Sequence, residues 1–378
     1  MSRLHVMRPW LGEEESAALA DVIASGWVAQ GPRVAEFETA FAAAMEADHA
    51  VAVSSCTTGL HLALLVAGVG PGDEVVVPSF SFIATANAAV YVGARPVFAD
   101  VDPLTGNLTD ATIAAAITDR TRAVVAVDQG GVPVDLVALR AVCDPRGIVV
   151  VEDAACGAGS TYRGRPVGAG AEIAAWSFHP RKILTTGEGG MVTTSRADWA
   201  ARVRTLREHA MDVSAADRHT QVLAPEERFT EVGFNFRMTD LQAAVGIVQL
   251  RRLPEAVARR RALAAAYAKV VADIPGLRCV ADPEWGTGNF QSFWVEVMAD
   301  YPTDRDGLLE HLARADISAR RGIMACHRQP AYAEGDGGDV RLPVTARLTD
   351  HTLILPLFHE LSESDQQRVV EVLRDPGR

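Results

Sequence analysis

A lysine between a strand-like run and a glycine-rich turn has the clearest chemical potential in this sequence. Lys182 follows an apolar run that ends in Ser177–His179, and it precedes the turn Gly187–Gly190. A lysine amine at a strand end, beside a flexible loop, can form a Schiff base with a carbonyl compound. Most lysines are solvated surface groups, but this chain has only two, Lys182 and Lys269, among its 36 basic residues. This scarcity favours a chemical role for Lys182.

Acidic and hydroxyl side chains follow two other strand-like runs. Asp153 comes shortly after the run Ile148–Val151, and Ser54–Gly59 follows the run Ala50–Val53 and opens a helical pattern. Ligands of α/β proteins gather at the carboxyl ends of parallel strands. A carboxylate there can pair with a cationic ligand, and free N–H groups at a helix start suit a phosphate. The structural alternatives are a turn or capping aspartate and plain N-capping by a Ser/Thr run.

An aromatic side chain follows a further strand-like run. Phe82 lies shortly after the run Glu74–Val77, where its ring could stack on a planar ligand, although aromatic residues are more often part of the core. Two familiar phosphate motifs are missing. Gly187–Gly190 is not part of G-x-x-x-x-G-K-[ST], and Ser54–Gly59 does not supply G-x-G-x-x-G, which sets aside an NAD-dependent Rossmann enzyme.

The composition is that of a globular protein with a sizeable core. The 378 residues are 48% hydrophobic and 22% charged, and the net charge is −12. An acidic chain is a poor candidate for binding nucleic acid or an anionic membrane surface. No apolar run approaches the roughly 20 residues of a membrane span, and Met1–Gly12 has no signal-peptide core. Five scattered cysteines without a CxxC pair argue against disulfides and zinc, so we expect a cytoplasmic protein without a metal.

Short β-branched runs alternate with helical patterns from about residue 50 to 194. The strand candidates are Ala50–Val53, Glu74–Val77, Pro96–Ala99, Ala123–Val127, Ile148–Val151, Ile173–Phe178 and Met191–Thr194. The helix candidates between them include Thr58–Ala67, Ile83–Tyr91 and Asp135–Cys143. Such alternation, with nearly continuous apolar strands, predicts an α/β fold with a mostly parallel sheet covered by helices on both faces.

The pattern changes after Thr239 to longer helices and then to mixed structure. Pro254 fits the first turn of one helix. Further on, the sequence predicts strands and helices in turn: Phe293–Val297, Arg305–Ala315, Leu353–Leu355 and a last helix that opens near Ser362. We therefore expect a large α/β domain over residues 1–250, with an N-terminal helical segment, and a smaller α+β domain over residues 251–378.

Taken together, these segments resemble the DegT/DnrJ/EryC1/StrS family of sugar aminotransferases, which are fold-type I pyridoxal-phosphate enzymes. The resemblance covers nearly the whole chain, and the order and spacing of the pieces make it specific. The matching segments are Ser25–Trp27, Gln30–Pro32, Thr57–Leu64, Gly72–Val75, Pro78–Asn87, Gly93–Val97, Glu152–Ala155, Ser177–Gly190 and Gly233–Met238.

The resemblance implies roles around the cofactor ring. Lys182 resembles the lysine that forms the Schiff base with pyridoxal 5'-phosphate, and Asp153 resembles the partner of the pyridine nitrogen. Phe82 occupies the position that stacks on the ring. Two positions depart from the family pattern. Cys156 stands where a glutamine usually lies near the cofactor hydroxyl, and Asp128 stands where the family often has a histidine. We expect cofactor binding to survive both changes.

The resemblance also implies phosphate and substrate contacts. The phosphate ligands would be Ser177 and the turn Cys56, Thr57 and Thr58. Asn235 matches an asparagine that reaches the cofactor phosphate of the neighbouring subunit, which implies a homodimer with shared active sites. The weaker candidates for substrate contact are Arg237, His327 and His179. For Arg237 and His327, an ordinary ion pair and a satisfied polar residue are the alternatives.

The reaction that the resemblance implies is a two-stage amino transfer. L-glutamate would leave its amino group on the cofactor as pyridoxamine 5'-phosphate, and a nucleotide-linked keto-sugar would then receive it. A dTDP-4-keto-6-deoxyhexose is the expected acceptor, and an aminosugar for natural-product or cell-surface glycan biosynthesis the product. Two alternatives stay open: a cyclitol or aminoshikimate-type aminotransferase that uses glutamine, and a cofactor-binding regulator without turnover. Related dehydratases replace the lysine with histidine, which disfavours that activity here.

Overall fold

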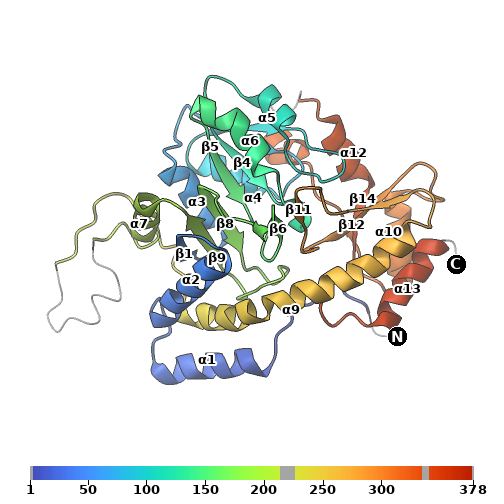
Figure 1. Ribbon diagram of the computed structural model, residues 1–378, viewed down its shortest axis with the longest axis horizontal. Coiled ribbons are helices and arrows are strands. Elements are labelled where there is room, and N and C mark those ends of the chain that lie inside the picture. The colour runs from blue at the N-terminus through green and yellow to red at the C-terminus, as the bar shows by residue number, and fades with distance from the viewer. Residues whose placement is uncertain (1–2, 213–225, 334–339, 377–378) are drawn as a thin grey trace.

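The computed structural model describes residues 3–212, 226–333 and 340–376, and a seven-stranded sheet forms its centre (Figure 1). The order across the sheet is β1-β9-β8-β5-β4-β2-β3. The strands are β1 His49–Val53, β2 Glu74–Pro78, β3 Arg95–Ala99, β4 Thr121–Val127, β5 Val149–Asp153, β8 Ile173–Ser177 and β9 Gly190–Thr194. Strand β9 runs antiparallel to both of its neighbours, β1 and β8, and the other neighbouring pairs of this sheet are parallel. The predicted α/β fold with a mostly parallel sheet is confirmed.

Helices cover both faces of this sheet, as predicted. They are α2 Pro32–Ala44, α3 Cys56–Val66, α4 Ala84–Tyr91, α5 Asp110–Ala116, α6 Leu136–Cys143 and α7 Ala197–Leu206. One apolar layer packs Phe37 and Phe41 of α2 against Trp176, and the other packs Leu60 of α3 with Val203 of α7. Alternate strand residues enter opposite layers, because side chains alternate across a strand.

Smaller sheets follow in the carboxyl-terminal part. A four-stranded antiparallel sheet has the order β10-β12-β14-β13, and a three-stranded one has the order β11-β6-β7. Their strands are β10 Leu277–Cys279, β12 Phe293–Val297, β13 Arg320–Arg321, β14 Thr352–Leu355, β6 Thr161–Tyr162, β7 Arg165–Pro166 and β11 Gly286–Thr287. The helices here are α10 Arg305–Arg314, α11 Pro330–Ala333, α12 Pro343–His351 and α13 Glu363–Arg374. The strands and helices predicted beyond residue 290 are thus present.

A 32-residue helix, α9 Asp240–Val271, runs along the molecule and connects the two parts of the chain (Figure 1). Thr239 and Gln242 form its capping box. The prediction that Pro254 opens a helix is wrong, since Pro254 lies inside α9. Proline removes one backbone hydrogen bond there, but burial on either side, at Leu253 before it and Ala256 after it, keeps the helix continuous. The expected boundary after residue 250 falls within this helix, and the division into two domains stays a prediction.

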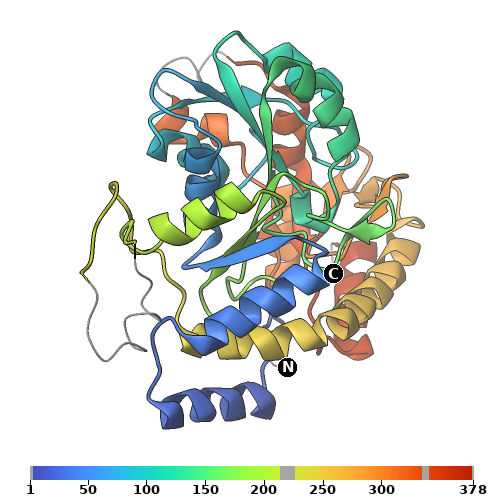
Figure 2. The ribbon, with the colours of Figure 1, turned by 60° about the vertical axis from the view of Figure 1, so that its left-hand side comes forward.

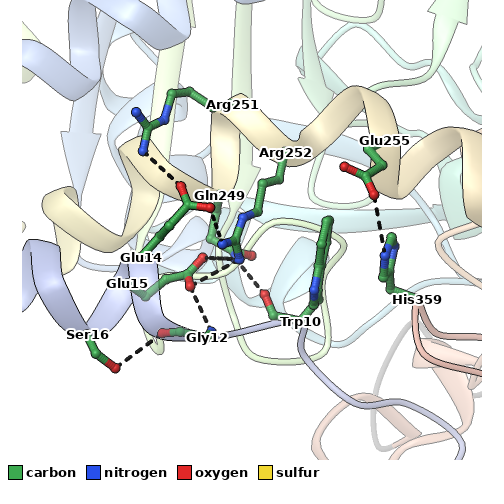
Figure 3. Close-up of polar contacts among 10 residues, drawn as sticks. All are labelled: Trp10, Gly12, Glu14, Glu15, Ser16, Gln249, Arg251, Arg252, Glu255 and His359. Atoms are coloured by element: carbon green, nitrogen blue, oxygen red, sulfur yellow. Dashed lines mark hydrogen bonds and ion pairs between the residues drawn. The ribbon is translucent and has the colours of Figure 1, made fainter.

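The N-terminal segment holds α9 through a polar cluster (Figure 3). Helix α1 Glu13–Ser25 lies beside α9 (Figures 1 and 2), and Arg252 of α9 bonds Glu15 at 2.9 Å and Glu14 at 2.6 Å. The ring of Trp10 stacks on His359 with a centroid distance of 3.6 Å, and the Arg252 guanidinium lies 4.9 Å from the Trp10 ring. This cluster ties the start of the chain to α9 and to the segment before α13.

Candidate active site

The residues singled out from the sequence gather at one cavity of about 240 Å³, at the carboxyl ends of β5 and β8 and the start of α3. Its lining includes Cys56, Thr57, Phe82, Asp153, Ser177, His179 and Lys182. Strand ends from distant parts of the sequence meet here because β5 and β8 are parallel neighbours in the sheet. The sheet edge where α/β proteins bind ligands is therefore the edge that carries these side chains.

Lys182 lies in the loop between β8 and β9 and points its amine into this cavity region. Its backbone N–H donates to the His179 carbonyl at 2.8 Å, and its Nζ donates to the sulfur of Cys156 at 3.1 Å. Burial alone would lower the pKa of the Lys182 amine, but the neighbouring Cys156, Cys56 and Asp153 together raise it. The amine is therefore held in its charged form by acidic groups on the adjacent elements.

Asp153 ends β5 and is 4% exposed. Thr85 Oγ1 donates to its Oδ2 at 2.9 Å, and the amide of Ala155 donates to its Oδ1 at 3.2 Å. Burial raises the pKa of this carboxyl, while these donors and the Lys182 charge act in the opposite direction. On balance the pKa of Asp153 is raised, and a cationic ligand beside it would lower that pKa and stabilise the carboxylate.

The start of α3 also lines the cavity, and its Cys56 thiol donates to Asp153 Oδ1 at 3.8 Å. Ser55 caps the helix by accepting from the amide of Thr58 at 3.2 Å. The first turn leaves the amides of Cys56 and Thr57 without a partner inside the helix, so they can bind an anion. Strand β9 approaches this turn closely. A Cβ at Gly190 would lie 2.5 Å from the Ser55 carbonyl carbon, so only glycine fits.

Two predicted cofactor contacts adjoin the cavity without being part of its lining. Thr58 turns its hydroxyl back to the amide of Ser55 at 3.1 Å, which is the capping role considered from the sequence. Cys156 reaches the site through its contact with Lys182. Phe82 does line the cavity, and its ring is largely exposed.

The remaining predicted contacts lie outside this cavity or at its rim. Asn235 is exposed and pairs with Glu208 in an isolated β-bridge. Arg237 is half-buried and makes no ion pair within the described part of the chain. His327 is buried, with Nδ1 2.6 Å from the hydroxyl of Ser79. His179 lies at the rim, 3.9 Å from Glu188.

Several residues that support the site carried no sequence signal. Gln291 accepts from the amide of Ile183 at 2.7 Å and donates to the carbonyl of Arg181 at 2.6 Å, so it grips the loop around Lys182. Asn289 donates to the carbonyl of Cys156 at 2.7 Å. Both are more than a hundred residues away from their partners and follow no strand-end pattern, so only the tertiary fold reveals them.

The described residues contain no helix long and apolar enough to cross a membrane. Within the same ranges, no group of three or more His, Cys, Asp or Glu side chains could hold a metal ion.

The fold and the cavity define a fold-type I pyridoxal-phosphate transferase, and comparison with known proteins agrees. The model of the DegT/DnrJ/EryC1/StrS aminotransferase family matches residues 9–374. The aminotransferase TlmJ from Streptoalloteichus hindustanus is 40% identical, with a TM-score of 0.90 over 98% of each chain. The chain therefore belongs to the DegT/DnrJ/EryC1/StrS aminotransferase family.

Two further solved structures are similar over almost their whole length. DesV from S. venezuelae, solved in complex with a ketimine intermediate, is 34% identical with a TM-score of 0.90 over 100% of each chain. DesI, solved in the presence of its TDP-sugar product, is 34% identical with a TM-score of 0.89, and the match covers 99% of this chain and 93% of DesI.

The protein is thus an aminotransferase that depends on pyridoxal phosphate, and its cavity fits that cofactor. Its lining combines the amine of Lys182, the buried carboxylate of Asp153 and a helix start whose first amides have no partner inside the helix. These are the groups needed for a Schiff base, for a protonated ring nitrogen and for a phosphate. Lys182, Asp153 and the start of α3 would hold those three parts of the cofactor.

Proposed function

We propose that this enzyme transfers the amino group of L-glutamate to a nucleotide-linked keto-sugar, with a dTDP-4-keto-6-deoxyhexose as the acceptor. The product would be an aminosugar for natural-product or cell-surface glycan biosynthesis. The observation that carries the proposal is the convergence of Lys182, Asp153 and the α3 start on one cavity. The similarity to DesI, which was solved with a TDP-sugar product, supports the choice of acceptor.

The residues of the cavity would divide the work. When bound, the cofactor supplies an electron sink for the carbon that loses its proton. Lys182 Nζ would take the proton from the α-carbon of the donor and deliver it to the cofactor carbon that keeps the amino group. In the second stage it would move a proton in the reverse direction, from that cofactor carbon to the acceptor carbon. Asp153 would keep the ring nitrogen protonated, and the amides of Cys56 and Thr57, with the Ser177 hydroxyl, would bind the phosphate. Replacing Asp153 by Asn should leave folding intact and slow turnover by at least about 100-fold.

A cationic rim supports an acceptor that carries a diphosphate. Arg181 lines the cavity beside His179, and Arg320 of β13 lies close enough to influence both. Partial burial and the charge of Arg181 lower the pKa of Arg320. Neither arginine makes an ion pair among the described residues, whereas Arg321 pairs with Asp306 at 3.2 Å. Two like charges placed together, neither of them in an ion pair with a carboxylate of the described residues, suit a polyanionic ligand.

A second copy of the chain would complete the site. Asn235 lies outside the cavity of its own chain, on a segment where Phe229 is 61% and Val232 is 87% exposed. Exposed apolar side chains of this kind are typical of a contact surface. A homodimer in which Asn235 reaches the cofactor phosphate of the other copy would account for both observations.

A cytoplasmic location is supported by the five cysteines, all of which are free thiols.

The acceptor class can be tested by separating the two stages. L-glutamate first converts the enzyme to its pyridoxamine-phosphate form, and the remaining donor is removed. The enzyme is then offered three kinds of acceptor: keto-sugars as TDP conjugates, the same sugars without the nucleotide, and a cyclic ketone of the cyclitol type. The visible absorbance band of the pyridoxal-phosphate form should return with the TDP conjugates and with neither of the other acceptors, and that result supports the proposal. Return with the cyclic ketone, or conversion by glutamine in place of glutamate, supports the cyclitol alternative. The absence of any second stage would favour a regulator without turnover.

A further inference from the structure

Two acidic side chains occupy the layer beneath the site, on neighbouring strands. Ala126 of β4 stands beside Glu152 of β5, and Val127 stands beside Asp153. Asp128 extends β4 by one residue, and its amide donates to the carbonyl of Asp153 at 3.2 Å. Because side chains alternate across a strand, Asp128 and Glu152 face the same side of the sheet, and Asp153 faces the other. The two carboxyls are therefore diagonal neighbours.

Both carboxyls are fully removed from water and incompletely bonded. Asp128 is 0% exposed and Glu152 is 1% exposed. Asp128 Oδ1 accepts from the amide of Val134 at 3.0 Å, and Glu152 bonds the amide of Gly168. Asp128 Oδ2 and Glu152 Oε2 have no hydrogen-bond partner, and no cation pairs with either residue in the ranges that the structure describes.

The surroundings of the pair disfavour two negative charges. The groups that act on Asp128 from the adjoining elements are Glu152, Asp153 and Cys156, all of which are acidic. Burial first, and then the charge of Glu152, raise the pKa of Asp128 well above its usual range. Burial likewise raises the pKa of Glu152 to about 8. When two carboxyls share a buried site without a cation, one of them keeps its proton.

We propose that Asp128 and Glu152 share one proton in a carboxyl–carboxylate hydrogen bond, and that this pair is a positioning element beneath the site. The bond joins the end of β4 to the end of β5, directly below Asp153. It also reaches the turn that carries Cys156, because a Cβ at Gly157 would lie 2.9 Å from Asp128 Oδ2. Neither side chain touches the cavity, so both act through the backbone of its residues.

The shared proton limits the charge behind the site. With one proton, the pair carries a single negative charge. Without it, three carboxylates would crowd the ends of β4 and β5. The effect on the bound cofactor rests on the proposed role of Asp153, but the existence of the pair does not.

The test compares Glu152→Gln and Asp128→Asn with the wild type, because an amide keeps a hydrogen-bond donor and removes the titration. The folded state holds a proton that the unfolded chain releases near pH 4.5, the usual pKa of the glutamate side chain. Thermal stability of the wild-type holoenzyme should therefore fall as the pH rises from about 4.5 to about 8, and level off above that. Each variant should lose most of this dependence and match or exceed the wild type at pH 8.

Glu74→Gln is the matched control. Glu74 is also a buried glutamate of the central sheet, but Arg95 and Arg120 pair with it. Although burial opposes the shift, Thr118 and these arginines lower its pKa to about 2. Its replacement should destabilise the protein at neutral pH, where Glu152→Gln should not. Equal losses at pH 5 and pH 8 in Glu152→Gln would overturn the proposal, because they would mean that an ionised carboxylate is required.

An infrared spectrum of the wild type keeps the proposal testable if a variant fails to fold, and a visible spectrum adds a second readout where Glu152→Gln folds. The wild type should show an infrared carbonyl band of a protonated carboxyl at pH 7 that disappears by pH 9. A spectrum without that band at pH 7 would contradict the shared proton. In holoenzyme, the visible cofactor band should show an alkaline step that Glu152→Gln lacks. The same alkaline step in wild type and variant would contradict the proposal that the pair acts on the site.

Discussion

The Nζ atom of Lys182 lies 3.1 Å from the sulfur of Cys156, to which it donates a hydrogen bond. The contact joins the loop after β8 to the turn after β5, and Asn289 fixes that turn through the Cys156 carbonyl. The side chain that departs from the family pattern is thus in direct contact with the reactive amine. Its thiol supports the charged form of Lys182, because Cys156 is the largest of the influences that raise the pKa of that amine.

Removing this thiol should change the amine without unfolding the site. In Cys156→Ala, burial of Lys182 is no longer opposed by its nearest acidic neighbour, so the pKa of the amine should fall. We expect the first stage with L-glutamate to slow by about 10-fold and its pH profile to shift to lower pH. Stopped-flow absorbance across pH measures both. Cys279→Ala, at a half-buried thiol remote from the cavity, is the control, and an unchanged profile in Cys156→Ala would refute the role.

The cationic rim predicts a selective effect on the acceptor. Arg320→Gln should raise the KM for a TDP-keto-sugar by about 10-fold, since a charge-assisted hydrogen bond contributes about 1.5–3 kcal/mol. The first stage with glutamate should keep its rate. Arg321→Gln changes the adjacent residue of the same strand, which already pairs with Asp306, and should leave both stages unchanged. A matching loss in the glutamate stage would mean that the rim binds the donor.

The shared site predicts complementation between two defective chains. Lys182→Ala and Asn235→Ala should each be inactive or nearly so as homodimers. A hybrid dimer should contain one site that carries both changes and one site that carries neither. Co-expression with different tags, followed by purification of the hybrid, should therefore recover about half of the wild-type activity per dimer. If Asn235 served the cavity of its own chain, both sites of the hybrid would be defective and no activity would return.

The close approach of β9 to α3 predicts a steric effect on stability. Gly190→Ala would place a methyl group against the backbone of Ser55 and Cys56. We expect a loss of about 1–3 kcal/mol in the free energy of unfolding, with weaker cofactor binding because the phosphate-binding turn is displaced. Chemical denaturation and cofactor titration measure the two effects. Gly70→Ala, where a Cβ meets nothing within 4 Å, should be nearly neutral.

The sequence revealed the parts of the site that lie at strand ends. Lys182, Asp153 and the turn at Cys56 each follow an apolar strand, and parallel strands bring such ends to one edge of a sheet. The strand pattern also predicted the central sheet, with ends within two residues of those observed. These features depend on local residue types, which a sequence displays directly.

Other parts of the site depend on contacts that no local pattern encodes. Gln291 bonds the two residues that flank Lys182, and Thr85 bonds Asp153, in each case from a distant segment. The proximity of Arg320 to Arg181 arises from the packing of the smaller sheet. The prediction for Pro254 was wrong because proline prefers the first turn of a helix but is not confined to it. The capping box at Thr239 and buried packing begin α9 earlier and carry it past the proline.

The central claim is that Lys182 holds the cofactor and moves the proton, and one spectroscopic experiment tests it most directly. Wild type, Lys182→Ala and Lys269→Arg are each reconstituted with pyridoxal phosphate, and visible spectra are recorded before and after L-glutamate. The account predicts a visible band that glutamate bleaches in the wild type and in Lys269→Arg. In Lys182→Ala it predicts no lysine-linked band and no turnover. A lysine-linked band with turnover in Lys182→Ala would contradict the account.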